Sequence, residues 1–256
     1  MAARLAEHGC LILEGAFTAS FITELYQAFD ARYGGMSAED MEAKCHQTGG
    51  PNKFFQVGGR RYEIAPTMKP PFSDPRLYAN DGIRSVLNLL LGEMYKVSSF
   101  SVVVSHPGAD MQHVHRDHNH LYEGEDVGRD LPPHAINVAV PLVDVDLEVG
   151  STAFWPGSHR WETDHPCPEE QMVVPTLRPG DCMMLDYRTM HGGLPNRSAR
   201  VRPILYVVYA RPWFFDEKNF TNRNPLDLPE REYAKLPPDM KELMSRSARL
   251  RLLGKG

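Results

Sequence analysis

The spacing of apolar residues changes along the chain, from helical periods near the start to short strand-like runs in the middle. An apolar run at residues 10–13 is followed by Thr18, a candidate N-cap, and by apolar side chains at helical intervals over residues 21–29. The same period returns over residues 81–94. This pattern predicts a strand and two amphipathic helices, and we expect both helices to pack on the outside of a sheet.

The segment between these helices, residues 49–71, holds aromatic residues and several turn formers. Long irregular segments in compact domains are often lids, so this segment is a candidate mobile flap over a site. A surface loop without a role is the alternative. Arg60 and Arg61 could meet an anionic substrate there, although two arginines in a loop are usually solvated.

From residue 97 onward, short runs of β-branched and aromatic residues are broken by Pro, Gly and Asp. The strands that these runs predict span residues 99–104, 135–140, 172–174, 183–185 and 203–209. Several short strands favour a sandwich or barrel over a doubly wound sheet. The polar, proline-punctuated stretch after them predicts an outer helix near residues 239–252.

No internal repeat or linker divides the sequence, so we expect a single domain over residues 1–256. The pattern places its β core at about residues 97–210. Helices and the flap would occupy residues 1–96, and a helical extension would occupy residues 211–256. A chain of 256 residues can bury a sizeable core in such an arrangement.

The charge of the chain argues for a small-molecule partner. Its 28 Lys and Arg against 33 Asp and Glu give a net charge of −5, which provides no basic field for nucleic acid or an anionic membrane. The four cysteines have neither metal-like nor disulfide-like spacing. The N-terminus is charged where a signal peptide would be apolar, and no stretch has the length of a membrane span, so we expect a cytoplasmic protein.

A possible metal site begins at His115 and Asp117. Alternate side chains of an extended segment face the same way, so these two would project together while Arg116 points away. His191 follows a predicted strand and precedes two glycines, which makes it a candidate third ligand. Two imidazoles and one carboxylate on one face of a metal form the facial triad of non-haem Fe(II) enzymes, which leaves positions open for reactants.

Arg202 suggests an anchor for a carboxylate, by an argument independent of the metal. It begins the predicted strand 203–209, where alternate residues face inward. A guanidinium there can bind a carboxylate through two parallel hydrogen bonds, whereas a buried arginine without such a partner would be costly. A 2-oxo dicarboxylate that chelates iron through its oxo-acid end would put its far carboxylate within reach.

These features together carry a family resemblance. Residues 112–117 (QHVHRD), 150–161 (GSTAFWPGSHRW) and 191–196 (HGGLPN), with Arg202 after them, resemble the phytanoyl-CoA dioxygenase family. The opening residues 8–15 (HGCLILEG) resemble it as well. The resemblance implies a mainly β fold: a double-stranded β-helix, or jelly-roll, core with flanking α-helices. It also implies an oxygenase that uses Fe(II), 2-oxoglutarate and O2.

The resemblance also implies roles for particular residues. His115, Asp117 and His191 would bind iron, and Arg202 would bind the C5 carboxylate of 2-oxoglutarate. Thr152, in the Gly-Ser-Thr turn, is similar to the family residue whose hydroxyl supports the same end. Gln112 matches an upstream glutamine that often approaches the co-substrate, but its offset from the iron histidine varies in the family. His113 therefore competes with Gln112 for that role.

The reaction that the resemblance implies is oxidation of a C–H bond of a small organic metabolite, with release of succinate and CO2. Hydroxylation is the default, and desaturation, epoxidation and ring formation share its chemistry. Halogenating relatives lack the carboxylate ligand, so Asp117 argues against halogenation. The sequence identifies neither the substrate nor the oligomeric state.

Two alternatives to the oxygenase remain. His113 and His115 could open a cupin-type metal site, but such a site needs a glutamate a few residues later, and Glu123 follows only after eight residues. The other is a non-catalytic jelly-roll protein that binds or senses a ligand. A structural metal site would normally be closed by a fourth protein ligand, which speaks against it.

Several further residues fit structural roles first. His118 and His120 are expected at the surface or the edge of a pocket, and His159 is expected to cap backbone. The aromatic residues 213–215 could line a pocket but more often pack in a core. Asp186 and Tyr187, just before His191, could support the iron site or simply pack within a strand.

Overall fold

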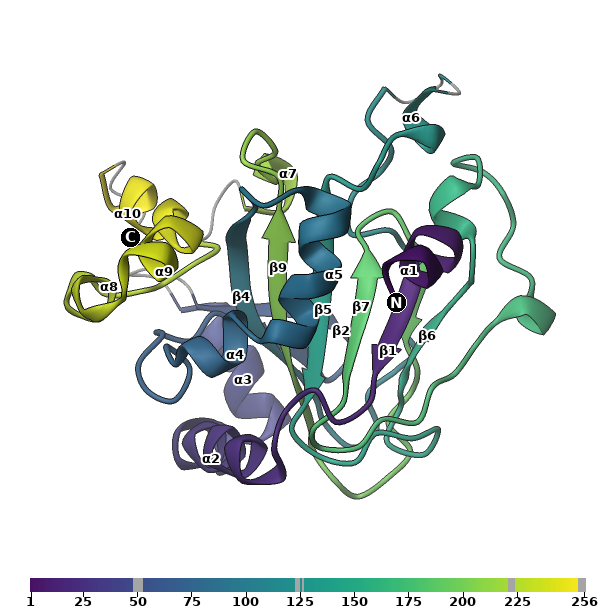
Figure 1. Ribbon diagram of the computed structural model, residues 1–256. Coiled ribbons are helices and arrows are strands. Elements are labelled where there is room, and N and C mark those ends of the chain that lie inside the picture. Colours follow the sequence, from purple (N-terminus) through teal and green to yellow (C-terminus); the bar gives the residue numbers. More distant parts are fainter. Residues whose placement is uncertain (48–52, 123–124, 126, 221–223, 253–256) are drawn as a thin grey trace.

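The computed structural model describes residues 1–47, 53–122, 125, 127–220 and 224–252. A seven-stranded antiparallel sheet forms its centre, in the order β1-β7-β5-β9-β4-β3-β2 (Figure 1). The strands are β1 (Cys10–Leu13), β2 (Phe54–Gly58), β3 (Arg61–Ile64), β4 (Lys96–Ser105), β5 (Ala135–Pro141), β7 (Cys182–Asp186) and β9 (Arg202–Ala210). Four of the five strands predicted after residue 97 are confirmed in part or in full.

A smaller antiparallel layer lies against this sheet. It pairs β6 (Thr152–Phe154) with β8 (His191–Gly193), and single bridges join His115 to His191 and Phe154 to Val173. The predicted strand at residues 172–174 is therefore wrong, because only Val173 makes a ladder bridge. Prolines at positions 168 and 175 flank this segment and limit regular pairing.

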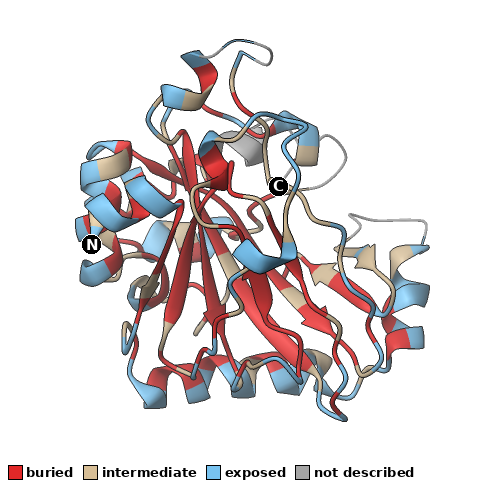
Figure 2. Cartoon of the chain, turned by 90° about the vertical axis from the view of Figure 1, so that its right-hand side faces the viewer, coloured by how far each residue is buried: buried red, intermediate tan, exposed pale blue. Residues whose placement is uncertain are grey.

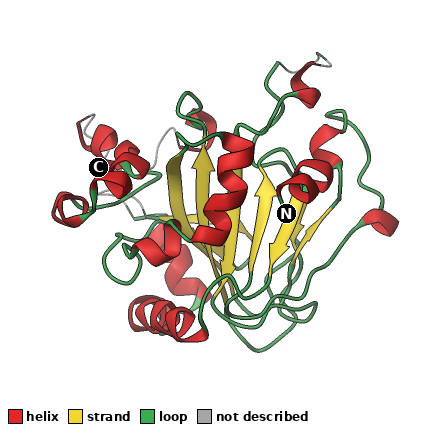
Figure 3. Ribbon diagram, viewed as in Figure 1, coloured by secondary structure: helices red, strands yellow, loops and turns green. Residues whose placement is uncertain are grey.

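Helices cover the outer face of the large sheet (Figures 1 and 3). The α-helices are α1 (Ala2–His8), α2 (Ala19–Phe29), α3 (Ala38–Cys45), α4 (Pro75–Tyr78), α5 (Asp81–Leu91), α6 (Val127–Asp130), α7 (Glu217–Phe220), α8 (Glu230–Lys235), α9 (Pro238–Leu243) and α10 (Ser245–Leu252). Short π and 3-10 turns span Asp30–Gly34, Ser158–Arg160 and Glu169–Gln171. None of the helices in the described ranges is long and apolar enough to cross a bilayer.

The two predicted amphipathic helices are confirmed as α2 and α5. The Thr18 side chain caps α2 by accepting a hydrogen bond from the amide of Phe21. Helix α5 ends at Leu91, three residues before the predicted end, because Gly92 has φ +79°, a conformation that favours glycine. Apolar residues of both helices pack with the outward side chains of the strands.

Alternation along the central strands separates the packed face of the sheet from the face with the cavity. On β9, Leu205, Val207 and Tyr209 belong to the core under the helices, whereas Arg202 and Tyr206 face the other side and line a cavity. Figure 2 shows that these strands are buried along most of their length. Polar inward residues are therefore held in fixed positions by an apolar framework.

Residues 54–64 of the predicted flap form the hairpin of β2 and β3 at one edge of the large sheet, so the expected irregular structure is wrong there. Part of the hairpin lines the cavity described below, and its movement over a site stays a prediction. The two glycines at 58 and 59 and Arg60, with φ 53°, make the turn. A pair of glycines between two short apolar runs is typical of a β-hairpin. Residues 49–52 of the predicted flap lie outside the described residues.

The predicted C-terminal helix is broken. Helix α9 ends at Leu243; the next residue, Met244, adopts a non-helical conformation, and α10 begins directly after it. Met244 is fully buried in the main core, and both α9 and α10 contact β4. A break at this point lets two short helices pack on one strand, which a straight helix over residues 239–252 would not do.

Candidate active site

A cavity of about 790 Å³ lies on the inner face of the large sheet. Strands β3, β4, β5 and β9 contribute its floor, and β8 with the segment 112–119 contributes the opposite wall. All the residues singled out for iron and co-substrate line this cavity. These residues are His115, Asp117, His191, Arg202, Thr152, Gln112 and His113.

His115, Asp117 and His191 converge in one cluster. Each offers one ligand atom, and these atoms lie within 4.8 Å of one another. The two imidazole rings have centroids 4.5 Å apart, and Nε2 of His191 lies 3.6 Å from Oδ1 of Asp117. No fourth histidine, cysteine or acidic residue among the described positions joins the group. Such a donor set fits an Fe(II) site with open coordination positions.

Both histidines are oriented in the same way. The Nδ1 atom of His115 lies 2.8 Å from the carbonyl of His113, and Nδ1 of His191 lies 2.9 Å from the carbonyl of Thr189. A carbonyl only accepts, so Nδ1 carries the proton and Nε2 is free to bind a metal. Burial and the neighbouring His191 also lower the pKa of His115 to about 4, which keeps its ring neutral at pH 7.

Two amide side chains from different elements hold Asp117. Asn137 on β5 donates from Nδ2 to Oδ2 of Asp117, at 3.0 Å. Asn219 on α7 donates to the backbone carbonyl of Asp117 at 2.9 Å and to Asp216 at 2.8 Å. Arg116 points away from the cluster, as expected, and donates to the carbonyls of Arg188, Ser158 and Trp161.

Arg202 has the environment of an anion anchor. It is 1% exposed, and its Nη1 donates to the carbonyl of Gly150, while Nε has no hydrogen-bond partner among the described residues. No carboxylate among the described residues lies within ion-pair distance of it, so its buried charge is not compensated by the protein. Burial lowers the pKa of Arg202 because the charged form loses hydration.

Arg61 is a second buried arginine that lines the cavity beside Arg202, so solvation, the usual state of two arginines in a loop, does not apply to it. Arg61 on β3 pairs with Ser105 on β4, and Ser105 pairs with Arg202 on β9, so the three side chains form one row on the inner face. Nε of Arg61 and Oγ of Ser105 are buried without a partner. Burial and the nearby Arg202 lower the pKa of Arg61 to about 10, so the guanidinium of Arg61 remains charged at pH 7.

The family model for phytanoyl-CoA dioxygenase matches residues 5–204. This chain belongs to the phytanoyl-CoA dioxygenase family. Among its curated relatives, the dioxygenase af480 of Aspergillus fumigatus is 30% identical over 162 residues, which cover 62% of this chain and 50% of the relative. The multifunctional dioxygenase ausE of Emericella nidulans is 26% identical over 211 residues, which cover 77% and 67%.

The dioxygenase andF of Emericella variicolor, another relative, is 34% identical over 109 residues, which cover 42% of this chain and 38% of the relative. This chain thus matches half or less of the length of both af480 and andF.

Solved structures show the same fold. The epimerase SnoN, in complex with Fe3+, alpha ketoglutarate and nogalamycin RO, has a TM-score of 0.57 at 21% identity, with 82% of each chain covered. HygX from Streptomyces hygroscopicus, with nickel, 2-oxoglutarate and hygromycin B bound, has a TM-score of 0.59 at 17% identity, with 83% of this chain and 86% of HygX covered. The predicted jelly-roll core with flanking helices is confirmed.

Three further residues of this family member that were predicted to contact the co-substrate lie near the cluster or near Arg202. Thr152 on β6 is buried and pairs with Gly193 on β8. Gln112 accepts a hydrogen bond from the Gly193 amide through Oε1, and the ring of His113 lies 4.9 Å from that of His115. All three line the cavity, and their contacts with a co-substrate stay predictions.

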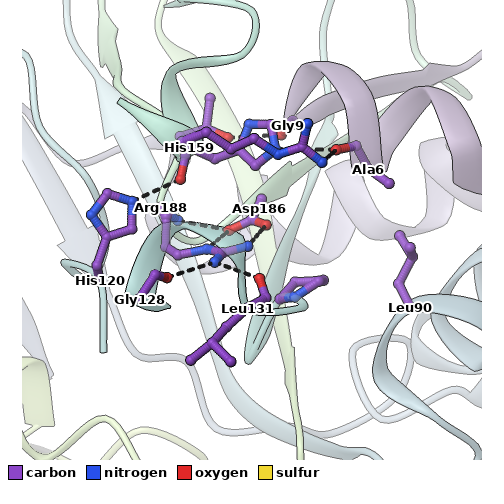
Figure 4. A network of polar contacts seen from close by, with 12 residues as sticks. Ala6, Gly9, Leu90, His120, Gly128, Leu131, His159, Asp186 and Arg188 are labelled. Atoms are coloured by element: carbon purple, nitrogen blue, oxygen red, sulfur yellow. Dashed lines mark hydrogen bonds and ion pairs between the residues drawn. The ribbon is translucent and has the colours of Figure 1, made fainter. Parts of the chain in front are cut away.

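The turn that leads to His191 is fixed by a buried ion pair, shown in Figure 4. Arg188 and Asp186 lie 2.7 Å apart, and Arg188 also donates to the carbonyl of Leu131 at 2.8 Å. His120 bonds to the carbonyl of His159, and His159 bonds to that of Ala6. The surface or edge position predicted for His120 is wrong, since its side chain is buried in this network. The structural role of His159 is confirmed.

The aromatic residues 213–215 do not line the cavity. Phe214 is buried and packs with Tyr187, whereas Trp213 and Phe215 are exposed. The core interpretation is therefore right for Phe214. Tyr187 lines the cavity and its hydroxyl donates to Asp216, the same carboxylate that Asn219 contacts.

Proposed function

We propose that this chain is an Fe(II)/2-oxoglutarate-dependent dioxygenase that oxidises a C–H bond of a small organic metabolite and releases succinate and CO2. The proposal rests on one cavity that holds both an open three-ligand cluster and two buried guanidiniums, for which the described residues supply no counter-ion. One centre suits a metal with free positions, and the other suits the far carboxylate of a dicarboxylate. Hydroxylation is the expected outcome.

His115, Asp117 and His191 would hold Fe(II), which with bound 2-oxoglutarate supplies dioxygen activation and an oxidant for a C–H bond. Arg202 and Arg61 would bind the C5 carboxylate and so set the direction in which the co-substrate lies. Asp117 occupies the position that a halide would need, which favours oxygen transfer over halogenation. The protein would bind the reactants and orient one C–H bond of the substrate toward the oxidant.

The floor of the cavity favours a substrate with polar groups. Ser101 on β4 and Tyr206 on β9 face each other across the strands, and their hydroxyls make no hydrogen bond with the described residues. The relatives support a small natural product, since nogalamycin and hygromycin B are the ligands of SnoN and HygX. Because SnoN is an epimerase, product analysis should look for an epimer as well as an added oxygen.

The first test is anaerobic addition of Fe(II) and 2-oxoglutarate. A weak visible charge-transfer band should form, and aeration with candidate natural products should yield succinate. Absence of both would leave the ligand-binding alternative as the better account of the fold. In that alternative the cluster would bind metal without turnover.

Single substitutions test the metal cluster and the carboxylate-binding arginines one at a time. Asp117→Ala should abolish iron-dependent succinate formation. Arg202→Ala should raise the concentration of 2-oxoglutarate needed far more than it weakens metal binding. Arg200→Ala is the matched control, because Arg200 lies two residues earlier and its side chain is 55% exposed. If Arg202→Ala weakens the binding of 2-oxoglutarate and of the metal equally, Arg202 does not act as the carboxylate anchor.

A further inference from the structure

Asn137 is a polar residue in the middle of a strand that is otherwise apolar. Strand β5 is buried along its whole length, and Asn137 is 7% exposed. It lies on the inner face, in a cross-strand row with Val208 on β9 and Leu185 on β7. Its neighbours Ile136 and Val138 face the main core. Packing alone would be satisfied by a leucine at this position.

The orientation of the Asn137 amide is set by its partner. A carboxylate only accepts hydrogen bonds, so the NH2 group faces Oδ2 of Asp117, at 3.0 Å, and the amide oxygen is turned away. That oxygen is buried and accepts no hydrogen bond from any described residue. A buried acceptor without a donor destabilises the fold. The residue is therefore better explained by its contact with Asp117 than by stability.

The two oxygens of Asp117 have different surroundings. Oδ1 lies 3.6 Å from Nε2 of His191, in the ligand cluster, while Oδ2 accepts the amide of Asn137. A carboxylate can bind a metal through one oxygen or through both. Binding through both would use a second coordination position, which an oxygenase needs for its co-substrate or for dioxygen.

We propose that Asn137 is a positioning residue that reserves Oδ2 of Asp117 and so makes Asp117 a one-oxygen ligand. Asn219 restrains the same residue from the other side, through its backbone carbonyl. The inference rests on the proposed function, because it assigns to Asn137 the task of keeping positions open at the metal.

The test compares Asn137→Leu with the wild-type protein, and Ser99→Ala serves as the control. Ser99 lies in the same cross-strand row, paired with Val208, and makes no hydrogen bond with the described residues. Affinity is measured by anaerobic titration with Co(II) alone and with Fe(II) in saturating 2-oxoglutarate. Metal-free Tm is measured in parallel. Asn137→Leu should lower metal affinity roughly 10–100-fold, as loss of hydrogen bonds to metal ligands does, while metal-free Tm stays unchanged or rises.

Two results would overturn the proposal. Metal affinity within about twofold of wild type would show that the amide does not position the ligand. A parallel fall of metal-free Tm and affinity would assign Asn137 a structural role. If wild type gives no Fe(II) and 2-oxoglutarate band but Asn137→Leu still loses Co(II) affinity, then the dioxygenase proposal fails and the positioning of Asp117 stands.

Discussion

Arg60 and Arg61 are adjacent in sequence but have opposite environments. The side chain of Arg60 is 45% exposed and pairs with Glu39, whereas Arg61 is 1% exposed and lines the cavity. The hairpin turn ends between them, so the two side chains leave the backbone on different sides. The two arginines look equivalent in the sequence, but Arg60 is solvated and Arg61 belongs to the candidate anion site.

The first residue-scale prediction concerns this pair. Arg61→Met keeps most of the side-chain volume but removes the charge, and a charge-assisted hydrogen bond stabilises by about 1.5–3 kcal/mol. The KM for 2-oxoglutarate should therefore rise roughly 10–100-fold, with little change in Fe(II) affinity. Arg60→Ala should leave both constants unchanged. An unchanged KM in Arg61→Met would remove Arg61 from the co-substrate site.

A second prediction concerns pH. His134 is 1% exposed and packs against Phe214, and burial lowers its pKa to about 3. Between pH 6.5 and 3 the unfolded chain binds a proton that the folded chain does not, so stability falls as the pH falls. His134→Phe should reduce the slope of unfolding free energy against pH by about 1.4 kcal/mol per unit in this window. Urea unfolding of the metal-free proteins at pH 7 and pH 5 measures it, and equal slopes would contradict the assignment.

At the scale of elements, the turn between β7 and β8 is the support of His191. Asp186 at the end of β7 and Arg188 in the turn form a buried ion pair, and Thr189 supplies the carbonyl that orients His191. Arg188 also holds the carbonyl of Leu131, near α6. The Arg188 side chain thus links the turn before His191, a candidate metal ligand, to a segment that is distant in the sequence.

Breaking this ion pair should destabilise the fold and weaken the metal site together. Arg188→Met leaves Asp186 buried without its partner, which costs about 3–5 kcal/mol of unfolding free energy. The double variant Asp186→Leu/Arg188→Met should lose less than the sum of the single variants, because no charge remains buried. Urea unfolding of the four proteins gives the coupling, and additive losses would mean that the two side chains act independently.

Elements with clear periodicity were predictable from the sequence. The runs that became β4, β5, β7 and β9 are mostly apolar or β-branched, and α2 and α5 carry helical spacing with caps. The segment 172–174 has the same composition but lies between prolines and makes one bridge. The break at Met244 depends on packing against β4, a tertiary cause that local pattern does not contain.

At the scale of the whole molecule, the cavity combines charges that the fold leaves unpaired. Two buried guanidiniums have no carboxylate partner in the part of the chain that the structure describes, so binding of a dicarboxylate should raise the free energy of unfolding. With Fe(II) present and oxygen excluded, 2-oxoglutarate at about 100 times its Kd should stabilise by about 2.7 kcal/mol and raise Tm by roughly 5–10 °C. 2-Oxobutyrate, which lacks the far carboxylate, is the control. An equal shift with both acids would contradict the anchor.

Part of the site could be predicted because short motifs carry it. His115 and Asp117 share one face of an extended segment, and His191 and Arg202 stand at motif positions of the family. Arg61 could not be told from its neighbour Arg60 by sequence, because its burial depends on the pairing of the hairpin with β4, where it lies opposite Ser105. Asn137 gave no signal, since one polar residue in an apolar run does not reveal its partner.

The order of strands has a consequence for how the protein is made. Strand β9 is last in the sequence but lies between β5 and β4, so without it the large sheet is two separate pieces. One piece carries Asn137 and the other carries Arg61, while β9 itself brings Arg202. A nascent chain therefore cannot join the metal cluster to the anion site until residues 202–210 have been synthesised and inserted.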